Sequence, residues 1–235
     1  MQPFASERKI NTSLYYSQRE NEYDNDEIEA IKNRLELFIQ KQNRESGKPL
    51  SMASRMDLIT EMNLIESLKT SDVAISLLRA IWLSGSGKDA GEDLIEAERL
   101  AAMGPSHYIS AEEKFLNVIN ENGSWPEPLY RLASLLYKQE RLEESRKLLE
   151  CVLSAKPWHF GALSDIVAVC NGMDDTVNAN IWAERYVPPL KNTQGRKQWV
   201  DRVLYDIQKI LSVEDSSDTD TIAGLDPDMF DDVWQ

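Results

Sequence analysis

Apolar residues recur along most of the chain at the three- and four-residue spacing that places them on one face of an α-helix. The segment 126–157, PEPLYRLASLLYKQERLEESRKLLECVLSAKP, shows the pattern best. It predicts one helix with Leu129, Leu132, Ala133, Leu136 and Tyr137 on its apolar face, then a second with Leu142, Ser145, Leu148, Leu149 and Val152 facing the first. No segment alternates apolar and polar residues as a half-buried strand does. The pattern therefore predicts an all-α fold.

A second regularity is a repeat in which position 111 corresponds to 145 and to 179. In each copy a small residue is followed by apolar residues 4, 7 and 8 places further on, so that all four share one helical stripe. The three sets are Ala111, Phe115, Val118 and Ile119; Ser145, Leu149, Val152 and Leu153; and Ala179, Ala183, Tyr186 and Val187. The repeat predicts stacked helix-turn-helix pairs.

Breaks in the pattern divide the chain into five parts. Helices of the repeats are expected at Asp93–Met103, Ile109–Glu121, Gly161–Cys170 and Asp175–Tyr186, beside the pair in 126–157. Upstream helices are expected at Asp26–Lys41, Ser54–Leu68 and Asp72–Leu83, the last with Asp72 as its N-cap. The resulting organisation is a disordered N-terminus (1–25), N-terminal helices (26–88), repeats (89–190), a capping helix (194–211, with Gln198–Leu211 amphipathic) and an acidic disordered tail (212–235).

The central pair resembles the tetratricopeptide repeat (TPR). The small residues of that motif correspond to Ala133 and Ser145, its large residue to Leu149 and its closing proline to Pro157. Glu140 stands where the motif has a turn glycine, and Leu129 where it has tryptophan. The resemblance implies a right-handed TPR-like α-solenoid in which the C-terminal helix covers the last apolar face.

A narrower resemblance rests on Ile81-Trp82 and on the segment PWHFGAL (157–163). Both are similar to a TPR-like family of α-proteobacteria, plants and algae, although Ser164-Asp165 replaces the Ser-Gly that ends the family motif. This resemblance implies a chloroplast or mitochondrial location. It implies no reaction, because the family has no settled biochemical activity.

Charge is concentrated at the C-terminal end. The formal net charge is −14, and after Lys209 the chain has eight acidic residues and no basic one. Such a charge repels nucleic acid, so no nucleic-acid partner is expected. No run of about 20 apolar residues is present, which argues against membrane insertion and for a soluble intracellular protein. Cys151 and Cys170 lie among apolar neighbours, as small buried side chains do.

Candidate chemistry is sparse. The two histidines, His107 and His159, fall in predicted loops, and neither has metal-ligating neighbours at helical spacing. The glycine-rich segment 84–88 lacks the glycine and the Ser/Thr that a phosphate loop requires, since Ala80 and Asp89 stand there. These observations predict no enzyme, no metal and no cofactor.

The candidate binding residues lie on the first helix of the central pair. Tyr130, Arg131, Ser134, Tyr137 and Lys138 occupy the positions that line the concave inner face in TPR domains. They predict a mixed aromatic and basic groove for a peptide or helix. Reversing the charge of Arg131 should then weaken binding without loss of stability. The next repeat has Ser164, Asp165 and Ala168 in the corresponding slots, so half of a carboxylate clamp is missing. A chaperone C-terminal tail is therefore not the expected ligand.

The acidic tail carries Met229, Phe230, Val233 and Trp234, which would share one face of a helix. One interpretation is an unstructured solubilising tail. The other is a short linear motif in which Phe230 and Trp234 dock on a partner or on the chain's own groove. Taken together, these patterns favour a protein–protein interaction adaptor or assembly factor. The alternative is a structural subunit built permanently into a larger complex.

Overall fold

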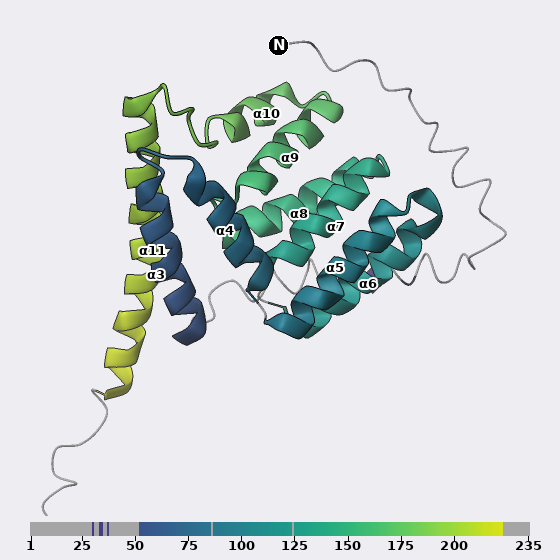
Figure 1. The fold of residues 1–235 in the computed structure, drawn as a ribbon, viewed down its shortest axis with the longest axis horizontal. Coiled ribbons are helices and arrows are strands. Elements are labelled where there is room, and N and C mark those ends of the chain that lie inside the picture. The colour runs from purple at the N-terminus through teal and green to yellow at the C-terminus, as the bar shows by residue number, and fades with distance from the viewer. Residues whose placement is uncertain are drawn as a thin grey trace, which may run out of the picture. The chain divides into compact units, whose positions relative to one another are not determined.

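The computed structural model of the chain describes residues 30, 33, 34, 37, 52–85, 87–123 and 125–222. Within these residues all regular secondary structure is helical, which confirms the all-α prediction (Figure 1). Of the expected helix Asp26–Lys41, only four residues are described, and they are helical. No helix in the described part of the chain is long and apolar enough to cross a membrane.

The described residues divide into two compact units, one with residues 30, 33, 34, 37, 87–123 and 125–186 and the other with residues 52–85 and 187–222. We call the first the repeat unit and the second the three-helix unit. The helices of the repeat unit are α5 (Lys88–Ala102), η1 (Pro105–His107), α6 (Tyr108–Glu121), α7 (Pro126–Lys138), α8 (Leu142–Ala155), α9 (Phe160–Gly172) and α10 (Thr176–Ala183). Those of the three-helix unit are α3 (Met52–Ser67), α4 (Val73–Ser84) and α11 (Thr193–Ile222).

In the repeat unit each helix from α5 to α10 packs against the next along the chain. The first helices of the three pairs also contact in order, α5 with α7 and α7 with α9. Helices α6, α8 and α10 begin at Tyr108, Leu142 and Thr176, so that successive starts are separated by the same offset as Ala111, Ser145 and Ala179. The predicted repeat length therefore reappears in the helix boundaries.

The predicted small positions are buried in all three copies: Ala111 and Ser145 are 0% exposed and Ala179 is 3% exposed. Ser145 Oγ donates to the Ala133 carbonyl oxygen at 2.8 Å, because the two helices of the central pair cross closely there. The third copy is only half correct. Helix α10 ends at Ala183, which leaves Ala183 and Tyr186 exposed instead of in the core.

The turns inside the second and third pairs have the same backbone. Glu140 has φ 59° and Asp174 has φ 58°, both in the left-handed region that favours glycine. In each turn the following residue donates its N–H to the carbonyl five residues earlier, Arg141 to Leu136 and Asp175 to Cys170. This is the hydrogen bond of a Schellman helix end, which needs a left-handed residue. Glu140, which stands where the TPR motif has a turn glycine, therefore has a backbone conformation that glycine adopts without strain.

The junctions between pairs carry equivalent ion pairs of opposite polarity. Arg141 Nη1 lies 2.6 Å from Glu112 Oε2, and Arg146 Nη1 lies 3.1 Å from Asp175 Oδ2. At the repeat offset, residue 112 corresponds to 146 and residue 141 to 175. At the first junction the earlier pair supplies the acid and the later pair the base, and at the second junction these roles are reversed. Both junctions therefore have an ion pair between the two helix pairs.

The three-helix unit is centred on α3, which packs against both α4 and α11. Arg196 of α11 is 1% exposed, and its guanidinium donates to the Leu68 carbonyl (2.6 Å), to the Pro188 carbonyl (2.8 Å) and to the Asp72 carboxylate. Asp72 stands at the N-cap of α4 as predicted, but its side chain binds Arg196 and makes no capping hydrogen bond.

Two sequence expectations differ from these helices. Helix α11 packs along α3, and its expected cover of the last repeat pair stays a prediction. It continues past Leu211 to Ile222, so that residues 212–222, expected to begin the disordered tail, are helical. Helix α5 starts at Lys88, ahead of the predicted Asp93, and Asp89 in its first turn interacts favourably with the helix dipole.

Candidate functional site

Helix α7 presents one apolar and one polar face. Leu129, Leu132, Ala133 and Leu136 are buried at 5% exposure or less, which fixes the rotation of the helix against its neighbours. The opposite stripe follows three- and four-residue spacing and contains Glu127, Tyr130, Arg131, Ser134, Tyr137 and Lys138. We call the surface formed by this stripe, by Glu98 of α5 and by Asp165 of α9 the first-helix face.

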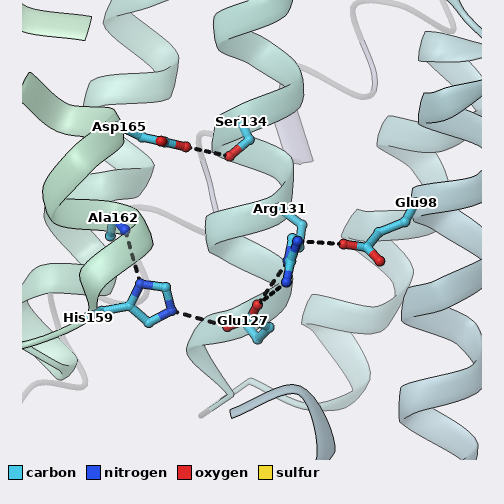
Figure 2. Close-up of polar contacts among 7 residues, drawn as sticks. All are labelled: Glu98, Glu127, Arg131, Ser134, His159, Ala162 and Asp165. Carbon is cyan, nitrogen blue, oxygen red and sulfur yellow. Dashed lines mark hydrogen bonds and ion pairs between the residues drawn. The ribbon is translucent and has the colours of Figure 1, made fainter. Parts of the chain in front are cut away.

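Arg131 lies at the centre of a charged cluster. Its Nη2 is 2.7 Å from Glu127 Oε1 within α7, and its Nη1 is 2.8 Å from Glu98 Oε1 on α5 (Figure 2). Its guanidinium carbon also lies 5.2 Å from the centre of the Tyr130 ring. Two carboxylates of the fold therefore balance this cation.

His159 joins the same cluster from the turn before α9. Its Nε2 lies 3.1 Å from Glu127 Oε2, and its Nδ1 accepts the Ala162 backbone N–H at 3.0 Å (Figure 2). The ring is 2% exposed and packs tilted on Tyr130, with 4.7 Å between ring centres. Burial raises the pKa of Glu127, but the hydrogen bond from His159 and the charge of Arg131 outweigh this effect and leave that pKa below its usual value.

Ser134 and Asp165 form a separate contact between α7 and α9. Ser134 Oγ donates to Asp165 Oδ2 at 2.7 Å. Burial is the main influence on Asp165 and raises its pKa, and neither the Ser134 hydrogen bond nor the Arg131 charge compensates for it. The Asp165 carboxylate is thus only partly stabilised by the neighbours that the structure gives it.

Gly161 lets Tyr130 approach the first turn of α9. A Cβ atom at this glycine would lie 2.5 Å from Cζ and from the hydroxyl oxygen of Tyr130, which is closer than real Cβ contacts. The glycine in the segment PWHFGAL therefore has a packing reason. Tyr130 fills the space above it and connects α7 to α9.

No family model, curated protein or solved structure matches the chain.

The predicted site residues have different surroundings in the structure. Tyr130, Arg131 and Ser134 are half-buried and bound to neighbours within the repeat unit, whereas Tyr137 (40% exposed) and Lys138 are exposed at the end of α7. Because Arg131 is the counter-ion of the buried Glu127, charge reversal there is no longer expected to leave stability unchanged. Phe230 and Trp234 lie outside the described residues.

Four residues of the cluster were not among the predicted site residues: Glu98, Glu127, His159 and Asp165. Glu127 was detectable, because it lies three and four residues before Tyr130 and Arg131 on the same stripe. Glu98 and Asp165 come from the neighbouring first helices, so finding them required the contacts of α5 and α9 with α7. His159 was placed in a loop with a packing role, and the structure agrees with burial and adds the helix cap.

These side chains are not arranged as a nucleophile and its base. The hydroxyl of Ser134 donates to Asp165, while the carboxylate partner of His159 is Glu127. Both ring nitrogens of His159 already make contacts, one of them with the backbone. A Ser–His–carboxylate relay instead needs the hydroxyl bonded to the imidazole.

Proposed function

We propose that the chain is a protein-interaction adaptor or assembly factor built from TPR-like repeats that form a right-handed α-solenoid. Three observations support the repeat architecture: the even spacing of the starts of α6, α8 and α10, the ordered contacts of α5, α7 and α9, and the left-handed turn residues Glu140 and Asp174. Stacked pairs of this kind give extended surfaces suited to peptides and helices.

The first-helix face is the surface we propose for partner binding. The observation that carries this proposal is the stripe of polar and aromatic side chains on α7, which ends in the exposed Tyr137 and Lys138 and is bordered by Glu98 and Asp165. Tyrosine and charged side chains on a rigid helix are typical of interface contacts. Because Arg131 is already paired with two glutamates, the face lacks a free cluster of cations for a chaperone-type C-terminal carboxylate.

We propose further that the chain is not an enzyme and works without a cofactor. The support is the pairing of Ser134 with Asp165 and of His159 with Glu127, which engages the cluster's acid–base groups in contacts within the fold. Such an arrangement is suited to positioning helices.

The test is a quantitative affinity capture with the full chain as bait, in which the exposed residues are changed and the buried cluster is left alone. Tyr137→Ala with Lys138→Glu should lose most of the partner captured by the wild type. Lys147→Glu, at an exposed position of α8 in the same pair, is the matched control and should retain it. Equal capture by both variants would move the binding surface away from the first-helix face.

One observation favours the alternative of a structural subunit. Val177 and Ile181 of α10 are 68% and 53% exposed, whereas the equivalent positions of the preceding repeat, on α8, hold Glu143 and Lys147. Exposed apolar pairs of this kind are typical of surfaces that a permanent partner covers. The purified chain would then aggregate alone and become monodisperse only when produced with its partner. An adaptor would be monodisperse by itself.

A further inference from the structure

Two helices of the repeat unit begin with a side chain that accepts a backbone N–H three residues further on. Asp175 Oδ1 accepts from Asn178 at 3.1 Å at the start of α10, and His159 Nδ1 accepts from Ala162 at 3.0 Å at the start of α9. Among α4 to α10 these are the two side-chain N-caps. A carboxylate is a usual cap, whereas histidine is outside the preferred set.

The two hydrogen bonds of His159 define where its proton lies. A ring nitrogen that accepts an N–H cannot itself carry a hydrogen, so Nδ1 is unprotonated and the neutral ring has its proton on Nε2. That proton points to Glu127 Oε2 at 3.1 Å. The ring therefore connects α9 to α7 only in this one tautomer.

We propose that His159 is an acid-sensitive N-cap of α9: when the imidazole takes up a second proton, at Nδ1, it ceases to accept the Ala162 N–H and the first turn of α9 is released. The same proton turns the contact with Glu127 into an ion pair, so the ring stays attached to α7. The result is loss of the cap at the start of α9, with the contact to Glu127 kept and without unfolding of the repeat unit. Imidazole is the side chain suited to such a change near neutral pH.

Some groups around the His159 ring favour its protonated form, and others favour its neutral form. From α7, Glu127 favours the imidazolium directly, and Arg131, which shares Glu127, reduces that effect. From α9, Asp165 interacts favourably with a charged ring. Glu98 of α5 acts on the ring only through Arg131. Tyr130 of α7 packs on the ring. The backbone carbonyl of Lys156, in the turn after α8, accepts the backbone N–H of His159. Burial of the ring opposes protonation, and so does the Ala162 N–H, because its hydrogen bond needs an unprotonated Nδ1.

The released turn borders the first-helix face. Gly161 is the residue on which the Tyr130 ring packs, and Asp165, one turn further, holds Ser134. Acid is therefore expected to loosen the α7–α9 side of the face before the other side. The switch itself does not depend on the proposed partner-binding function.

The test is an NMR titration of the full wild-type chain from about pH 8 to about pH 5. Long-range ¹⁵N spectra report the two ring nitrogens of His159, and amide exchange reports the two caps. We expect Nδ1 to be unprotonated at the alkaline end. As it gains its proton, the protection factor of Ala162 should fall about five- to tenfold relative to that of Asn178. Asn178 is the matched control. Its cap is the carboxylate of Asp175, whose pKa is lowered by hydrogen bonds from Asn178, so this cap stays ionised throughout the titration.

His159→Asn supplies a cap that does not titrate. In this variant the ratio of Ala162 to Asn178 protection should stay constant over the whole titration, while His107→Asn should behave as the wild type. If His159→Asn does not fold, the wild-type titration decides alone. Any of three results would overturn the proposal: a protonated Nδ1 at the alkaline end, an Nδ1 that stays unprotonated down to about pH 5, or a protection ratio that stays constant over the whole wild-type titration.

Discussion

At Glu140 and at Asp174, a glycine variant should be more stable than an alanine variant, although glycine has the smaller side chain. The two residues have φ 59° and 58°, and an L side chain in that region costs roughly 1–2 kcal/mol. Glycine avoids this cost but loses roughly 0.5–1 kcal/mol more than alanine in backbone entropy on folding. The difference predicts that each glycine variant is more stable than the alanine variant at the same site by about 0.5–1 kcal/mol.

The comparison with alanine isolates the backbone effect, because both variants lose the same carboxylate. Glu143 is the matched control: it is exposed in the first turn of α8, where the backbone is helical. There glycine should be less stable than alanine by about 1 kcal/mol, so the sign reverses between neighbouring positions. Urea denaturation followed by far-UV circular dichroism measures all six variants, with an unchanged m value as the condition for comparison. Equal stability of glycine and alanine at 140 and 174 would refute the left-handed turns.

Three further predictions concern the repeat unit. Ala133→Leu should cost about 1–3 kcal/mol, because Ala133 is fully buried where Ser145 bonds to its carbonyl, and an unchanged urea midpoint would contradict this packing. Arg131→Gln should cost about 2–3 kcal/mol, since it leaves the buried Glu127 without its cation, whereas Lys138→Gln at an exposed position should stay within about 0.5 kcal/mol. Asp165→Asn should raise the melting temperature at neutral pH: burial raises the pKa of Asp165, so the folded state loses stability as pH rises through that value, and an uncharged residue avoids the loss. This gain should disappear in acid below the usual aspartate range, and a gain that persists there would have another cause.

The repeat and the helix type were predictable because they depend on local spacing. Ala111, Ser145 and Ala179 follow one another at a constant interval, and all three are buried. Glu140 was noted as a departure from the turn glycine of the TPR motif, but its left-handed backbone was not predicted. The third copy was predicted too long, since the apolar spacing continues to Tyr186 although α10 ends at Ala183.

The parts that sequence spacing missed depend on contacts between distant segments. The partner of α11 is α3, more than one hundred residues earlier, and an amphipathic stripe does not say which helix it will cover. The basic character predicted for the first-helix face disappears because Glu98, on a different helix, reaches Arg131. The N-cap at His159 was missed because histidine is not a standard capping residue.

The central claim, that a partner binds the first-helix face, is tested most directly by site-specific photocrosslinking in the full chain. A benzophenone side chain is introduced at Tyr137 on α7, at Ser164 on α9 or at Lys147 on α8, all of which are exposed. We predict covalent adducts with the same partner from positions 137 and 164 and none from 147. Adducts from position 147 alone would place the binding surface on the second helices and contradict the account.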